Sequence, residues 1–159
     1  MLTNYRIKKD YEDFKKIKPI GAKGGPIGED PNNWEISIPG PPDSPYEGGQ
    51  FKIKLELKKD YPNIPPECKF LTRVFHPNIN FIDGSICVNF LKKENTPDKA
   101  HSWTNKKTIC DVVIGLYGLL KFPNQDSPLN RNAYDLFNRD RPRYNQVAKC
   151  FTNKFAKNN

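Results

Sequence analysis

The sequence is poor in the groups that bind metals or form disulfides. It contains two histidines, one methionine and four cysteines, and no two cysteines form a CxxC pair. This composition allows no zinc-finger spacing. The cysteines are widely spread and follow no secretory leader, so we expect four reduced thiols, no disulfide framework and no bound metal. Each cysteine is then either a core residue or a nucleophile.

Long apolar runs are also absent. No stretch approaches the roughly 20 apolar residues of a membrane-spanning helix, and residues 1–14 carry charges where a signal peptide would be apolar. We therefore expect a soluble protein of the cytoplasm or nucleus with no membrane partner. A length of 159 residues with 36% hydrophobic residues predicts one domain, residues 1–159, and we expect a monomer.

The charge is strongly positive, with a net value of +8 and a pI near 9.3. Nucleic acid must be considered as a partner for such a chain. The lysines are scattered, however, and no basic helix, zinc finger or aromatic-rich RNA-binding signature occurs. We interpret the charge as a solvated basic surface and expect no nucleic-acid partner, whereas attraction to acidic proteins stays open.

Period-two alternation predicts three strands. Residues 34–38 and 51–57 alternate apolar and polar side chains, and 68–74 follow a proline-rich turn, 61–66, in which one peptide bond before proline could be cis. Residues 19–33 are rich in Gly, Pro and Asn, which is typical of a loop.

Helical spacing predicts the remaining elements. Residues 6–17 repeat apolar side chains on one face, and 108–122 are apolar on nearly every face, which indicates a buried helix. Two shorter helices close the chain, the last with Asp140 as its cap and Pro142 in its first turn. The predicted fold class is α/β (α+β): an antiparallel meander of about four strands flanked by N-terminal, central and C-terminal helices.

The four cysteines lie in different contexts. Cys68 falls in a strand and Cys110 in the apolar helix, so both are interpreted as small buried hydrophobes. Cys150 lies on the last helix. Cys87 lies in an irregular segment, 75–91, where a thiol could face solvent. Its position alone does not decide between a catalytic and a structural role.

The histidines do not suggest a cysteine protease. His76 is locked before Pro77, His101 lies in a polar loop, and neither stands in a protease motif. A thiol without a dedicated base is a poor hydrolase. It can still exchange with an incoming thioester, which needs only a modest thiolate fraction.

Several motifs together resemble the ubiquitin-conjugating enzymes. HPN at 76–78 is followed by GSICVNFL at 84–91, which contains Cys87. The segments 33–51, 60–70 and 123–137 and the position of Trp103 follow in the family's order and approximate spacing. Each motif is weak alone, but the resemblance extends from Ile7 to Phe155.

This resemblance implies a site. Cys87 would accept the carboxyl terminus of a modifier as a thioester, and an amine would then attack the thioester carbonyl. Asn78 would either stabilise the oxyanion or brace the active-site loop. Ser127 would help to orient or desolvate the attacking lysine, and Asn89 stands where relatives often have aspartate. For Ser127 and Asn89 a purely structural role is an equal alternative.

The resemblance also implies partners: ubiquitin or a ubiquitin-like modifier, an activating enzyme, a RING or HECT-type ligase and a substrate lysine. ATP is consumed by the activating enzyme, so no cofactor is expected here. Candidate contacts on the first helix, for the activating enzyme, are Arg6, Lys8 and Lys9. Candidate contacts in two later loops, for the ligase, are Pro62, Asn63, Asn105 and Lys106.

Some features depart from the family pattern. About eight residues are inserted between Cys87 and Trp103, where they could gate the thiol or form a tolerated surface loop. Asn63 replaces a frequent aromatic residue, so docking by the usual RING ligases could be altered or weak. Partial likeness to the conjugating enzymes of SUMO and Nedd-type modifiers leaves the modifier open. A catalytically silent modifier-binding variant and a nucleic-acid-binding domain are the alternatives from other classes.

Overall fold

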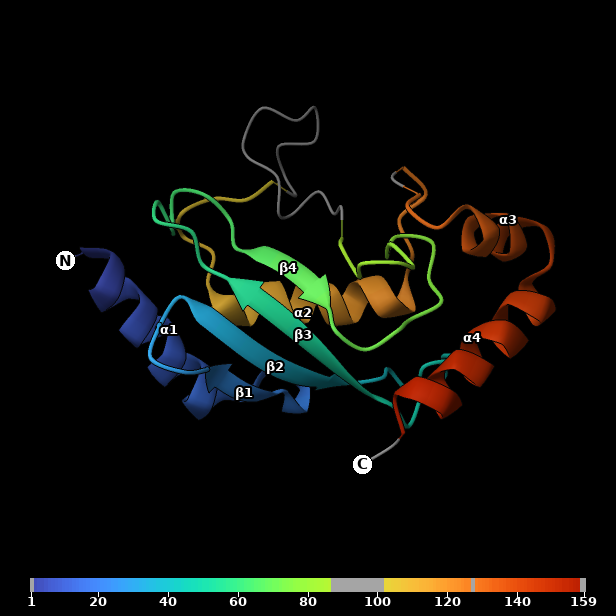
Figure 1. The fold of residues 1–159 in the computed structure, drawn as a ribbon, viewed down its shortest axis with the longest axis horizontal. Helices are drawn as coiled ribbons and strands as arrows, with labels where there is room; N and C mark the ends of the chain where they lie inside the picture. The colour runs from blue at the N-terminus through green and yellow to red at the C-terminus, as the bar shows by residue number, and fades with distance from the viewer. Residues whose placement is uncertain (1, 87–101, 127, 158–159) are drawn as a thin grey trace.

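The computed structural model describes residues 2–86, 102–126 and 128–157, with side chains from Tyr5 onward. A helix, a short 3-10 turn and a four-stranded sheet come first, followed by three helices (Figure 1). In chain order the elements are α1 (Leu2–Ile17), η1 (Pro19–Gly21), β1 (Lys23–Pro26), β2 (Asn33–Pro39), β3 (Gln50–Glu56), β4 (Glu67–Phe70), α2 (Ile109–Lys121), α3 (Arg131–Arg139) and α4 (Arg141–Phe155).

The sheet is an antiparallel meander in the order β1-β2-β3-β4. On β3 the side chains of Phe51, Ile53 and Leu55 point into the core, whereas Lys52 and Lys54 between them are exposed. Alternate side chains of a strand lie on opposite faces, so this pattern fixes the register with β2. The predicted α+β fold is confirmed.

Two strand predictions need correction. β1 lies inside residues 19–33, the segment predicted to be a loop. The strand was not predicted because its sequence, KGGP, lacks the alternation of apolar and polar residues. Its backbone comes so close to β2 that a Cβ on Gly24 would lie 2.2 Å from the Glu35 carbonyl oxygen. The predicted strand 68–74 ends at Phe70. Leu71 and Thr72 both donate to the Lys52 carbonyl there, which prevents the ladder from continuing in register.

α2 packs in the centre of the domain. Thr108 caps it by accepting the Asp111 N–H and donating its own backbone N–H to the Asp111 carboxylate. Most of its apolar residues are buried, but Ile114 is 51% exposed, so the helix is less enclosed than its sequence indicates. Among the described residues no helix combines the length and apolarity needed to span a bilayer.

The helices surround the sheet unequally. In Figure 1, α2 passes behind the sheet, α1 lies at one end of the molecule, and α3 and α4 lie at the other. α4 begins as predicted, with Asp140 accepting the Arg143 N–H and Pro142 in the first turn. The Tyr61–Pro62 peptide bond is cis, one of the bonds for which this was foreseen.

Candidate active site

The HPN segment, residues 76–78, runs through the interior of the protein. His76 and Asn78 are fully buried. The Pro77 carbonyl accepts the backbone N–H groups of Leu129 and Asn130, which tie the segment to the chain ahead of α3. The segment is therefore fixed by its backbone as well as by its side chains.

His76 is locked in one tautomer. Its Nδ1 accepts the Asn78 N–H at 3.0 Å, so Nε2 carries the hydrogen and donates to the Leu119 carbonyl at 2.7 Å. Burial lowers the pKa of His76 to about 4, and the hydrogen bond to Leu119 opposes this only in part. The imidazole is neutral near pH 7 and both nitrogens are engaged, so it cannot serve as a general base.

Asn78 joins the HPN segment to the loop after α2. Its Nδ2 donates to the Asn124 carbonyl at 2.7 Å, and its Oδ1 accepts the Asn124 N–H at 2.7 Å. Two short hydrogen bonds from one buried amide to one backbone residue form a clamp between segments 46 positions apart. These contacts are what a loop brace requires.

A tight hairpin leads from Asn78 toward position 87. Ile79 forms a bridge with Ile86, and Asn80 Oδ1 accepts the N–H groups of Ile82 and Asp83. Gly84 has a φ of 75°, and a Cβ there would lie 2.0 Å from the Phe70 carbonyl oxygen. Only glycine suits this position.

Three of the predicted catalytic residues, Cys87, Asn89 and Ser127, lie outside the described residues, as does His101. The described residue before Cys87 is Ile86, which pairs with the residue after Asn78.

The other cysteines differ in accessibility. Cys68 and Cys110 are buried, and burial raises the pKa of both thiols. They therefore match the prediction that they are core residues. Cys150 is exposed on α4. Among the described residues, no group of three or more His, Cys, Asp and Glu side chains could hold a metal ion.

The candidate partner-binding residues gather at the α1 end of the molecule. Lys8 and Lys9 are exposed on α1, whereas Arg6 is only partly exposed and donates to the carbonyls of residues 105 and 107. The loop that contains Pro62 and Asn63 contacts the loop that contains Asn105 and Lys106, because the indole of Trp103 donates to the Pro62 carbonyl. The candidate ligase contacts, at 62–63 and 105–106, therefore lie side by side.

Sequence reasoning missed Asn124, Gly84, Asp10 and Tyr61. Asn124 acts through its backbone, which no side-chain pattern reveals. Gly84 stands in the matched motif, but its need for positive φ appears only once its neighbours are placed. Asp10 looks like any polar residue of an amphipathic helix, yet it is 1% exposed.

Comparison with known proteins agrees with this geometry. A family model described as ubiquitin-conjugating enzyme matches residues 6–152. The solved E2 domain of a Toxoplasma gondii ubiquitin conjugating enzyme, TgTwinScan_2721, is 31% identical, with a TM-score of 0.86, and the match covers 98% of this chain and 99% of that one. The chain belongs to the ubiquitin-conjugating enzyme family.

Proposed function

We propose that this chain carries a modifier as a thioester on Cys87 and transfers it to a lysine amine. The observation that supports this most is the Asn78 clamp, which anchors the hairpin leading into position 87. A carrier thiol must present one bulky acyl group to two successive partners, and a rigid approach to the thiol serves both transfers.

The chemistry consists of two acyl transfers. The Cys87 thiolate attacks the carbonyl of the thioester that joins the modifier to the activating enzyme, and the cysteine thiolate of the activating enzyme leaves. A neutral lysine amine then attacks the Cys87 thioester, the tetrahedral intermediate expels the Cys87 thiolate, and the amine nitrogen loses a proton to solvent. His76 takes no proton in either step, because it is buried and neutral. Ser127 and Asn89 are proposed to orient the amine, which is consistent with activation by desolvation rather than by a base.

Ubiquitin is the proposed modifier, with a Nedd-type or SUMO modifier as the alternative. The proposed partners are an activating enzyme that contacts Lys8 and Lys9 on α1, and a RING or HECT-type ligase that contacts Asn63, Asn105 and Lys106. The chain itself is proposed to need no cofactor, since the activating enzyme consumes the ATP. Its proposed location is the cytoplasm or nucleus.

A charging assay tests the proposal. The protein is incubated with ATP and, in turn, the matched activating enzymes and modifiers of the ubiquitin, Nedd and SUMO types. We expect one modifier to give an adduct that reductant removes, that Cys87→Ala abolishes and that the matched control Cys150→Ser retains. An adduct that survives in Cys87→Ala, or no adduct with any modifier, would refute it.

A further inference from the structure

Arg6 links α1 to a loop far along the chain. Its Nε donates to Asp10 Oδ1 at 3.0 Å, its Nη1 to the Asn105 carbonyl at 2.8 Å and its Nη2 to the Lys107 carbonyl at 2.5 Å. Three N–H groups of one planar guanidinium thus have three separate acceptors, two of them in the 104–107 loop. The side chain is 22% exposed, so these hydrogen bonds are partly shielded from water.

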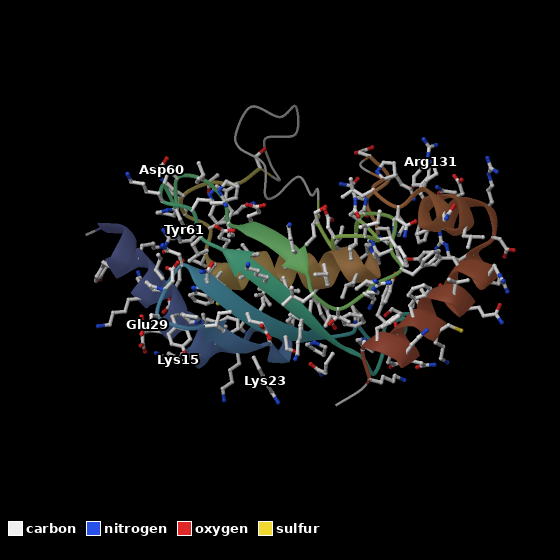
Figure 2. The ribbon with its side chains drawn as sticks, viewed as in Figure 1. Lys15, Lys23, Glu29, Asp60, Tyr61 and Arg131 are labelled. Carbon is white, nitrogen blue, oxygen red and sulfur yellow. The ribbon has the colours of Figure 1, made fainter. Side chains whose placement is uncertain are left out.

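Asp10 extends the link to a second loop. It accepts a hydrogen bond from the Tyr61 hydroxyl, and the Arg6 guanidinium lies 5.8 Å from the centre of the Tyr61 ring. Burial raises the pKa of Asp10, while the hydrogen bonds from Tyr61 and Arg6 act against this rise. Figure 2 labels Tyr61, which lies where the loop before β4 meets α1. One network therefore connects α1 with both predicted docking loops.

The two loops are also bonded to each other. Trp103 Nε1 donates to the Pro62 carbonyl at 2.8 Å, and Asn105 Nδ2 lies 3.5 Å from Asn63 Oδ1. Asn63 and Asn105 are exposed. The surface they form therefore depends on groups beneath it.

We propose that Arg6 is a positioning residue for the ligase: it holds the 104–107 loop against Tyr61–Asn63 and so sets the docking surface of Asn63, Asn105 and Lys106. This inference rests on the proposed function. It gives Arg6 a role that differs from the direct contact with the activating enzyme expected from its place on the first helix.

Arginine and lysine separate these two roles. A direct contact that depends on charge would largely survive Arg6→Lys, because the positive charge remains. The clamp would not survive, because a single ammonium cannot reproduce the planar fork that reaches three acceptors in fixed directions. Arg6→Gln removes both the charge and the fork.

The experiment compares wild type, Arg6→Lys, Arg6→Gln and the buried core variant Val113→Ala, which controls for general destabilisation. Discharge of the charged protein to free lysine is followed against the concentration of isolated RING domains, using the domain that accelerates wild type most. Hydrogen exchange is followed at the Lys107 amide, which donates to the Thr104 carbonyl and reports on the loop.

We expect both Arg6 variants to raise the RING concentration for half-maximal acceleration about fivefold or more, with the rate at saturation changed by less than about twofold, because docking and not chemistry is affected. The Lys107 amide should exchange faster in both variants. In Val113→Ala the half-maximal RING concentration should stay at the wild-type value.

Other outcomes overturn the inference. A normal Arg6→Lys beside a defective Arg6→Gln would identify a charge contact, and Arg6 variants that match Val113→Ala would leave Arg6 no docking role. If wild type charges but no RING domain accelerates discharge, the docking role is refuted while the Cys87 chemistry stands. If wild type never charges, the proposed function fails and the docking role falls with it, while Lys107 exchange still decides whether Arg6 holds the loop.

Discussion

Replacing Asn78 by alanine should cost measurable stability, because the side chain is fully buried and carries two 2.7 Å hydrogen bonds to the Asn124 backbone. Each such bond contributes about 1 kcal/mol net, and the space left behind adds roughly another 1 kcal/mol. The expected loss in the free energy of unfolding is about 2–3 kcal/mol. For a domain of this size that corresponds to a fall in Tm of about 4–12 °C.

Thermal and urea unfolding measure this loss, with Asn145→Ala on the exposed face of α4 as the matched control, expected within about 0.5 kcal/mol of wild type. Hydrogen exchange at the Asn124 amide should accelerate only in Asn78→Ala. A fall in Tm of less than about 2 °C would show that the clamp does not stabilise the fold. Charging and discharge of Asn78→Ala add a second reading. A loss of about a hundredfold in discharge with normal charging would instead assign Asn78 to the oxyanion.

Three other predictions address the surrounding structure. Gly84→Ala should lower the free energy of unfolding by at least about 2 kcal/mol and slow charging, because the new Cβ would meet the Phe70 carbonyl. Gly28 has a similar positive φ but open space around it, so Gly28→Ala should cost only about 1–2 kcal/mol. Urea unfolding compares the two variants, and equal costs would contradict the close contact at Gly84. Between pH 6.5 and 4 the unfolded chain binds more protons at His76 than the folded protein, so stability should fall by about 2 kcal/mol from pH 7.5 to 5. His76→Gln should remove that part of the pH dependence when the free energy of unfolding is measured at each pH. An unchanged slope of stability against pH in this variant would argue against the buried neutral imidazole. Thr108→Ala should cost about 1 kcal/mol by loss of the α2 cap, seen as a lower urea midpoint at an unchanged slope, and an unchanged midpoint would argue against the cap.

The sequence predicts those elements whose side chains face the core in a regular period. β2 and β3 alternate strictly, so the burial of their apolar side chains could be foreseen. The helical spacing in α1 likewise predicts the burial of Ile7 and Phe14, but Ile17 at the end of the helix is 60% exposed. β1 could not be, because it forms where Gly24 lets two backbones approach, and that contact leaves no hydrophobic pattern. The end of β4 could not be foreseen either, because the backbone N–H groups of Leu71 and Thr72 share the Lys52 carbonyl, and such a contact leaves no pattern of side chains.

The site was predictable only in part. HPN and the cysteine that follows it form a recognisable pattern, and they pointed to Asn78 as either a brace or an oxyanion donor. The partner of its amide, Asn124, could not be inferred, because the hydrogen bonds use main-chain atoms. Similarly, nothing in the first helix distinguishes Arg6 from its neighbouring lysines until the 104–107 loop is seen against it.

The acceptors for Arg6 in that loop are main-chain carbonyls, atoms that every amino acid supplies. Side chains at 104–107 can therefore be exchanged without removing an acceptor. A foreign loop of equal length grafted at 104–107 would therefore keep both carbonyl acceptors for Arg6, and under the proposed docking role such grafts would change which ligase binds without removing the Arg6 hydrogen bonds.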